Sequence, residues 1–327
     1  MPEGADLMKR RCAAILAGVL TAMSALSFTA AALSVKVGEM NIKYELSSKD
    51  SPFVTGDTVS AAVLIGVENA PEAFEIPGFA DTPDGRIVFT SIGDKAFIGT
   101  TGITSAVIPD TVDSIGDSAF AGCLSLERIA LPPTVRMIGA KVFVSCTSLE
   151  YADLGSKGSE LKAIPENSFS SCTNLAGVNI PYGVVGIGRE AFYGCNAMKS
   201  IEIPASVMFI GENAIGLRTN RITGDIEPIP DFIIAGSKGT AAESYARGKG
   251  IAFIDTSSTP MGDVNGDGTA DSSDASNVLQ VYSEVSTGSE SSFDNIQTYL
   301  ADVNRDGQTD SSDASEILAI YSENATS

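Results

Sequence analysis

Two twelve-residue stretches near the C-terminus, residues 263–274 and 302–313, place carboxylate or amide oxygens at positions 1, 3, 5, 9 and 12. Gly268 and Gly307 stand at position 6, where glycine permits the sharp turn that a short ligand loop needs. Calcium is a hard cation that takes roughly six to eight oxygen ligands, and alternating oxygens in a loop of this length suit it. The pattern therefore predicts a calcium-binding loop, present twice.

The predicted ligands stand at positions 1, 3, 5, 7, 9 and 12, with the main-chain carbonyl acting at position 7. We predict that two calcium ions are held by Asp263, Asn265, Asp267, Thr269, Asp271 and Asp274, and by Asp302, Asn304, Asp306, Gln308, Asp310 and Asp313. Both loops carry Asp where the common calcium-loop signature has a bidentate Glu at position 12. The alternative is a pair of solvated acidic turns, which would have to repeat the same positions by chance.

The duplication extends beyond the loops into the segments that follow them. Residues 263–284 align with residues 302–323 at an offset of 39, and the stretches DVN, DG, DSSDAS and YSE recur. The repeated unit is therefore a loop together with the apolar helix that we expect after it.

Residues 262–327 resemble a type I dockerin from end to end, because each Asp-rich loop is followed directly by Ser-Ser-Asp-Ala-Ser and an apolar helix. The resemblance implies a small all-α module, folded by calcium, that binds a cohesin domain of a cellulosome scaffoldin. The cohesin-binding positions that it implies are loop positions 10 and 11 and two helix positions. These are Ser272, Ser273, Leu279 and Gln280 in the first copy, and Ser311, Ser312, Leu318 and Ala319 in the second.

The two copies share the same Ser-Ser pair, so the resemblance also implies that either half can face the cohesin. The helix positions are less symmetric, since Gln280 corresponds to Ala319. Ser272 and Ser273 have a second interpretation as a helix N-cap beside Asp274, because a hydroxyl there can accept a hydrogen bond from an orphan backbone N–H. Capping and binding are compatible, and we expect both.

Length and charge place limits on the function. The chain has 327 residues, 43% of them hydrophobic, which fits two or three folded domains. Its net charge is −20, and residues 263–327 contain thirteen acidic residues and a single base, Arg305. This acidity argues against nucleic acid and anionic membranes as partners. Self-repulsion in the acidic tail should keep it loosely structured until metal binds.

The N-terminus has the pattern of a secretory signal peptide over residues 1–32. Lys9, Arg10 and Arg11 precede an apolar run that ends at Phe28, and small residues follow up to Ala32. We therefore predict a secreted, extracellular protein, at a cellulosome or a cell surface, without a membrane span after cleavage. A retained anchor is the alternative, but the apolar run is short for a membrane span.

The middle of the chain is an internal repeat. Isoleucines followed by Gly or Pro recur with offsets of 23, 23, 26, 23 and 23, at Ile92, Ile115, Ile138, Ile164, Ile187 and Ile210. A phenylalanine keeps the same phase in five units, and Ile215 replaces it in the last. A fixed period of this length predicts a solenoid. The unit pattern IGxxAFxxCxxLxxIxLPxxVxx resembles the BspA-like leucine-rich repeats of bacterial surface proteins over about residues 84–255.

These patterns together predict an α+β multidomain chain. A leucine-rich-repeat solenoid of short strands with short helices or turns is followed by the small all-α module. We assign residues 33–83 to an N-terminal cap, 84–255 to the solenoid with its C-terminal cap, 256–261 to a linker and 262–327 to the dockerin.

Four cysteines, Cys123, Cys146, Cys172 and Cys195, fall three residues after the repeated Phe of their units. Stacked coils place equivalent residues about 4.8 Å apart, which predicts a buried ladder of thiols. Disulfides and zinc are alternatives, but parallel side-chain directions disfavour bridges and the chain has no His. We expect free thiols.

The sequence favours a binding role over an enzyme. No His is present, and repeats, caps, signal and dockerin leave no stretch for a catalytic domain. The lack of Trp weakens a carbohydrate-binding role. We expect a secreted, noncatalytic cellulosome-associated protein whose repeats bind another protein or a cell surface. The alternative is a leucine-rich-repeat adhesin with a calcium-stabilised module and no cohesin partner. The outward-pointing strand residues offer the repeat surface, although a merely solvated face explains them equally well.

Overall fold

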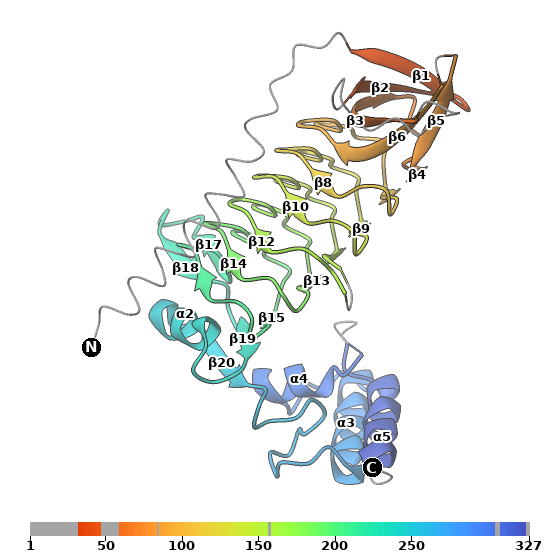
Figure 1. Ribbon diagram of the computed structural model, residues 1–327. Coiled ribbons are helices and arrows are strands. Elements are labelled where there is room, and N and C mark those ends of the chain that lie inside the picture. Colours follow the sequence, from red (N-terminus) through yellow and green to blue (C-terminus); the bar gives the residue numbers. More distant parts are fainter. Residues whose placement is uncertain (1–31, 47–58, 84, 156–157, 305–307, 325–327) are drawn as a thin grey trace. The chain divides into compact units, whose positions relative to one another are not determined.

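The computed structural model describes residues 32–46, 59–83, 85–155, 158–304 and 308–324 (Figure 1). The predicted signal peptide lies outside these residues, apart from Ala32. No helix in the described ranges is both long enough and apolar enough to cross a membrane.

The chain divides into two compact units. The first contains the residues up to Met198 and residues 204–227, and the second contains residues 199–203 and the chain from Pro228 onward. The repeats belong mainly to the first unit, and the predicted dockerin belongs to the second.

The first unit opens with a sheet whose earliest strands are antiparallel. Strand β2 pairs with β1 and β3, and β6 then joins β3 in parallel while β5 pairs antiparallel with β6. These strands are β1 (Leu33–Val37), β2 (Met40–Leu46), β3 (Val59–Glu68), β5 (Phe79–Thr82) and β6 (Gly85–Ile92). The sheet continues directly into the repeats, because β8 pairs in parallel with β6.

The repeats form a solenoid in which successive coils contribute short strands to two rows. One row is a five-stranded parallel sheet of β4 (Ala73–Glu75), β7 (Ser105–Val107), β9 (Arg128–Ala130), β11 (Tyr151–Asp153) and β13 (Gly177–Asn179). The other row contains β8 (Ser114–Ile115), β10 (Met137–Ile138), β12 (Ala163–Ile164), β14 (Gly186–Ile187) and β16 (Phe209–Ile210). Turns join the rows, and the predicted solenoid is confirmed.

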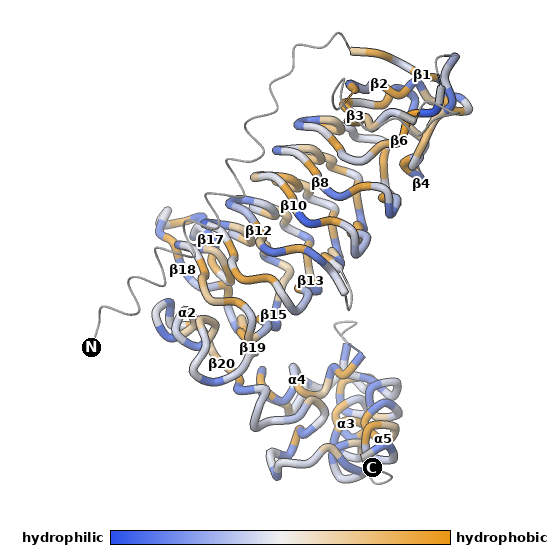
Figure 2. Tube along the Cα trace, in the orientation of Figure 1, coloured by the Kyte–Doolittle hydropathy of each residue, from blue (hydrophilic) through white to orange (hydrophobic). Residues whose placement is uncertain are grey.

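Apolar residues recur in every coil because each coil closes around a shared core (Figure 2). The five repeated phenylalanines stack with ring centroids 4.8–5.3 Å apart and interplanar angles of 20° or less. This spacing is close to the distance between neighbouring strands, so one ring fits each coil. Ile215 continues the column as a fully buried residue.

The glycine of the Ile-Gly pair is required by backbone contact between coils. A Cβ on Gly139 would lie 2.4 Å from the backbone nitrogen of Asp117 in the preceding coil. A Cβ added to Gly116, Gly188 or Gly211 would likewise lie 2.4–2.5 Å from its nearest atom in the preceding coil. The repeated motif therefore sets how closely the coils stack.

The four cysteines form the predicted buried ladder and are free thiols. Each Sγ donates to the carbonyl of the Phe in the preceding coil at 3.0–3.3 Å. Burial raises the pKa of Cys195, and a hydrogen bond with Cys146 together with burial raises the pKa of Cys123. The expectation of free thiols is confirmed for these four residues.

The second unit begins with a parallel three-stranded sheet of β15 (Ser200–Ile203), β19 (Ile233–Gly236) and β20 (Ala252–Asp255). Helix α2 (Ala241–Lys249) connects β19 to β20 in the sequence. Its C-cap is Gly250, which has a left-handed φ of 67°. Strands β17 (Leu217–Thr219) and β18 (Ile226–Pro228) form a separate two-stranded sheet.

Replacing Gly139 with Ala should destabilise the solenoid, because the added methyl group must push two coil backbones apart. We expect the free energy of unfolding to fall by about 1–3 kcal/mol, measured by urea denaturation. Gly102→Ala is the matched control, since a Cβ at Gly102 would meet no atom within 4 Å. Equal stability of the two variants would contradict the stacking role of the Ile-Gly pair.

The thiol ladder should resist modification while the protein is folded. Buried thiols with a raised pKa stay protonated at pH 8, and the thiolate is the reactive form. We expect a thiol reagent such as DTNB to label none of the four cysteines in the native chain beginning at Leu33, and all of them in urea. Rapid native labelling would show that the ladder opens.

Candidate calcium loops and interaction surfaces

Two carboxylates of the first loop are buried and hold the loop closed. Asp263 is 1% exposed and accepts hydrogen bonds from the backbone N–H groups of Asp267 and Gly268, among others. Asp274 is fully buried and accepts from the N–H of Val264 and of Asp271, at 3.0 and 2.9 Å. These two side chains therefore fix both ends of the loop from its inside.

The other candidate ligands of the first loop make local hydrogen bonds. Asn265 accepts from the N–H of Asp267 and donates to Ser273 Oγ at 2.8 Å. Asp267 accepts from the backbone and the hydroxyl of Thr269, and these bonds lower the pKa of Asp267. Thr269 thus contributes a side chain that orients Asp267, besides the main-chain carbonyl expected at position 7.

The second loop repeats this arrangement at the same offset. Asp313 is fully buried and accepts from the N–H groups of Val303, Asn304 and Asp310, as Asp274 does in the first loop. Asn304 also donates to Ser312 Oγ at 2.8 Å. Of the remaining candidates, Asp302 and Gln308 are partly buried and exposed respectively, and Asp306 lies outside the described residues.

Both loops contain buried carboxylate oxygens, which are the kind of ligand that a hard cation prefers. Three carboxylates, Asp263, Asp274 and Asp313, are buried without an ion pair to any described Lys or Arg. Burying ionised carboxylates costs free energy unless hydrogen bonds or a cation compensate them, and the backbone N–H groups supply part of that compensation. In the described ranges no three acidic, His or Cys side chains converge on a common point.

Helix α3 (Ser272–Ser286) begins at the first serine of the Ser-Ser pair, so the N-cap position falls on the residue before that serine. The helix is capped by Asp271, whose carboxylate accepts from the N–H of Ser273 at 2.7 Å. Asp274 completes a capping box by accepting from the N–H of Asp271. The expected N-cap role of Ser272 and Ser273 is therefore wrong. A carboxylate at position 9 takes the cap and leaves the serines as the first helical residues.

The loops are joined to three helices that share one apolar core. Helix α4 (Asn295–Ala301) precedes the second loop and α5 (Ser311–Asn324) follows it. The core of this module consists of Val264, Ala270, Ala275, Val278, Leu300, Ala301, Ala314 and Ile317. Ala275 and Ala314 are equivalent in the repeat, as are Val278 and Ile317, so the two copies bury the same helix face.

All eight candidate cohesin-binding residues are exposed. Ser272, Ser273, Leu279 and Gln280 lie on α3, and Ser311, Ser312, Leu318 and Ala319 lie at the same positions of α5. Leu279 and Leu318 expose 46% and 44% of their surface, which is high for leucine in a core-forming helix. The structure brings the two sets onto separate helices, one for each copy.

Sequence reasoning missed two further residues of these surfaces. Tyr282 and Tyr321 are 42% and 48% exposed and stand three residues after Leu279 and Leu318. Residues three apart on a helix are neighbours, so each helix presents a Leu-Tyr pair to solvent. The signal was present in the sequence, because the YSE stretch recurs in both copies.

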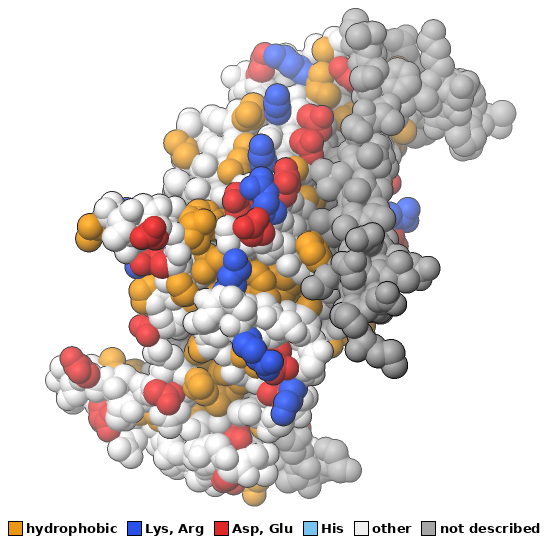
Figure 3. All heavy atoms as spheres, turned by 90° about the vertical axis from the view of Figure 1, so that its left-hand side faces the viewer, with side chains coloured by type: hydrophobic (Ala, Val, Ile, Leu, Met, Phe, Trp, Pro, Cys, Tyr) orange, Lys and Arg blue, Asp and Glu red, His pale blue; other side chains and the backbone are white. Residues whose placement is uncertain are grey.

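The five-stranded sheet of the solenoid presents two rows of outward residues. Ser105, Arg128, Tyr151 and Gly177 are in register in one of these rows. A Cβ on Gly177 would lie 2.9 Å from the Tyr151 ring, so the ring lies over the glycine. Figure 3 shows a different face, the left-hand side of Figure 1, on which basic and acidic side chains are interspersed.

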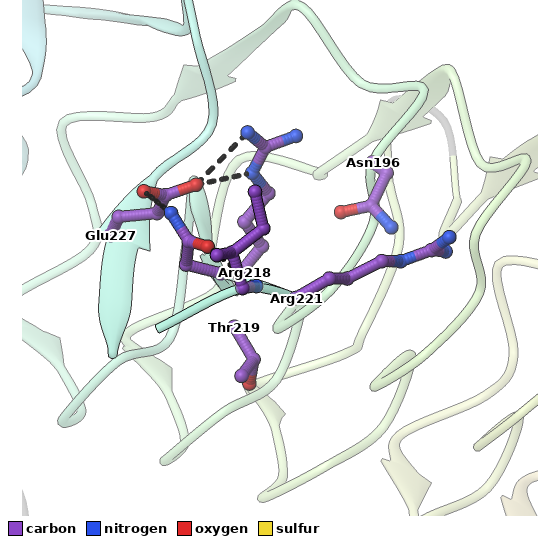
Figure 4. A pocket seen from close by; sticks show the side chains of 7 residues that line it. Asn196, Arg218, Thr219, Arg221 and Glu227 are labelled. Carbon is purple, nitrogen blue, oxygen red and sulfur yellow. Dashed lines mark hydrogen bonds and ion pairs between the residues drawn. The ribbon is translucent and has the colours of Figure 1, made fainter. Parts of the chain in front are cut away.

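A pocket of about 440 Å³ lies beside the β17–β18 sheet (Figure 4). It is lined by Asn196, Arg218, Thr219, Asn220, Arg221, Ile222 and Glu227. The repeat pattern gave no sign of this pocket, because these residues lie at and beyond the end of the repeated units.

Comparison with known proteins divides the chain in the same way. Residues 90–220 match the family described as a BspA type leucine rich repeat region, in six copies, and residues 261–319 match the dockerin type I domain. A search of curated proteins found no match.

Solved structures similar to the chain are leucine-rich repeat proteins. One is a leucine rich cell surface protein from Faecalibacterium prausnitzii A2-165, with 21% identity over 65% of this chain and 67% of that chain, and a TM-score of 0.39. Another is a leucine rich repeat protein from T. pallidum, with 24% identity over 42% of this chain and 83% of that chain, and a TM-score of 0.28.

The two matched families show which kinds of module the chain carries. Both are interaction modules and neither is a catalytic family, and both are typical of extracellular proteins. Type I dockerin domains bind calcium, in agreement with the oxygen donors of the two loops. The chain thus carries a BspA-type leucine-rich repeat region followed by a type I dockerin domain.

Proposed function

We propose that this is a secreted, noncatalytic protein that attaches to a scaffoldin through its dockerin and holds another protein or a cell surface through its repeats. The observation that carries the proposal is the pair of exposed Ser-Ser and Leu-Tyr surfaces, one on α3 and one on α5. Solvent-exposed leucine and tyrosine at equivalent positions are suited to burial against a partner protein.

Two calcium ions would be held by the twelve residues at positions 1, 3, 5, 7, 9 and 12 of the loops. When bound, calcium supplies positive charge that neutralises the buried carboxylates Asp263, Asp274 and Asp313. In the first loop, the carboxylates of Asp267 and Asp271 would bind the ion in place of some of the local hydrogen bonds that they now accept. Because Asp271 also caps α3, metal binding is coupled to the start of the helix that carries the contact surface.

The two surfaces would allow two orientations of the cohesin. Ser272 and Ser273 in one copy match Ser311 and Ser312 in the other, and the buried faces of both helices are equivalent. Gln280 hydrogen-bonds Glu284 at 3.0 Å on α3, whereas Ala319 has no side chain to do so on α5. The two orientations would therefore be similar in affinity without being identical.

The repeat region would act as an extended contact surface. Arg128 and Tyr151 are neighbours on its five-stranded sheet, and these residue types are enriched where proteins bind one another. We further propose the division into a cap (33–83), solenoid (84–255), linker (256–261) and dockerin (262–327), with the N-terminal 32 residues removed on export.

Calcium removal should unfold the dockerin while the solenoid persists. We expect a chelator to reduce the helical circular dichroism signal of the full chain, because the buried carboxylates then repel one another. Asp274→Asn should require about tenfold more calcium to restore the signal. The control, Glu290→Gln, removes an exposed acidic residue outside the loops and should respond like the native chain. A signal insensitive to chelator would contradict a structural role for calcium.

The two cohesin surfaces should be interchangeable. Changing Ser272 and Ser273 together to Ala should weaken cohesin binding only about twofold, since one of two orientations is lost. Changing all four serines, with Ser311 and Ser312, should weaken it by about a hundredfold or more.

The measurement is calcium-dependent retention of the full chain on a panel of immobilised cohesins. Ser289→Ala with Ser292→Ala is the control, because both serines are exposed and lie between α3 and α4. A full loss of binding from one serine pair would refute the dual mode. An absence of retention on every cohesin would favour an adhesin whose calcium module has no cohesin partner.

A further inference from the structure

The pocket beside the β17–β18 sheet contains a buried polar atom that has no partner. Asn196 Oδ1 is shielded from solvent and accepts no hydrogen bond from any described residue. An unsatisfied buried acceptor destabilises the fold, so such a group in a pocket is suited to a ligand that donates a hydrogen bond. The Asn196 amide is therefore a candidate recognition group.

One cation of the pocket is already neutralised. Arg218 donates from Nε and Nη2 to Glu227 Oε1 at 3.1 and 3.0 Å, and Asn220 donates to the other carboxylate oxygen at 2.8 Å. Hydrogen bonds from Asn220 and Arg218 lower the pKa of Glu227, which keeps this carboxylate ionised. The Arg218–Glu227 ion pair therefore lines the pocket without adding net charge to it.

The second cation is not neutralised within the described chain. Arg221 lines the pocket and forms no ion pair or hydrogen bond through its side chain with a described residue. Figure 4 shows its side chain extending toward the side of the pocket where Asn196 stands, while Glu227 stands on the other side. The pocket therefore carries one positive charge in excess, in a protein whose net charge is −20.

One apolar residue lines the pocket, because Ile222 is among its lining residues and exposes 95% of its surface. Side chains of this kind gain free energy when a partner covers them. A ligand for this place therefore combines an anion, a hydrogen-bond donor and a neighbouring apolar group.

We propose that this pocket binds an acidic peptide segment of another protein. The Glu or Asp carboxylate of that segment pairs with Arg221. The Asn196 side chain, which no hydrogen bond to a described residue holds in place, turns so that its Oδ1 accepts from a backbone N–H of the segment. An apolar residue beside the acidic one packs on Ile222. The site is independent of the cohesin surfaces, because all its lining residues belong to the first unit.

The test uses the full chain with calcium and a fluorescent peptide, Gly-Leu-Glu-Leu-Gly, blocked at both ends, followed by fluorescence anisotropy. We expect saturable binding that the matching Gln peptide does not reproduce. Arg221→Gln and Asn196→Ala should each weaken binding by about tenfold or more. Arg136→Gln is the control, because it removes an exposed guanidinium elsewhere in the repeats.

Thermal unfolding separates loss of binding from loss of structure. Asn196 and Arg221 make no side-chain hydrogen bond with the described residues, so neither variant should unfold at a lower temperature than the native chain. Asn196→Ala also removes the unsatisfied acceptor and should unfold at the same temperature or a higher one. The proposal would be overturned if the Glu peptide did not bind the native chain, or if the Gln peptide bound equally well. It would also be overturned if Arg221→Gln bound the Glu peptide as tightly as the native chain does. Preferential binding of galacturonate to the native chain would also overturn it, by assigning the pocket to an acidic sugar.

Discussion

Close backbone contact between successive coils is the constraint on which the repeat region depends. A Cβ added to Gly116, Gly139, Gly188 or Gly211 would lie only 2.4–2.5 Å from its nearest atom in the preceding coil. Once that spacing is set, one phenylalanine ring fits each of five coils and one thiol fits each of four, and the rings stack 4.8–5.3 Å apart. The outward strand residues then fall into register, which turns a periodic sequence into a continuous surface.

The C-terminal module depends on a different constraint, the burial of charge. Asp274 and Asp313 occupy the same place in the two copies, where each fastens its loop to the start of a helix. A carboxylate inside the fold makes the loop sensitive to a cation, while the helix beyond it exposes serine, leucine and tyrosine. The proposed metal site and the proposed partner surface are thereby only a few backbone residues apart.

The sequence predicted the parts of the structure that are repeated. Phe97 and its counterparts, the cysteines and the two loops each recur in the sequence, so the interpretation of one copy extended to the others. The structure confirms it for the stacked rings and the buried thiols. Features that occur once carried no such signal. The pairing of β3 with β6 and the pocket around Asn196 depend on contacts between different segments. The capping role of Asp271 was missed because serine and aspartate both cap helices, and only the geometry decides between them.

The proposed function joins a calcium-folded attachment module to a solenoid that binds a further partner. Native mass spectrometry of the full chain mixed with a cohesin is the sharpest test of this proposal, because one spectrum reports metal and partner together. We expect a complex of one chain with one cohesin that retains two calcium ions and dissociates when calcium is chelated. A chain that binds no calcium, or a complex with cohesin that persists without it, would contradict the account.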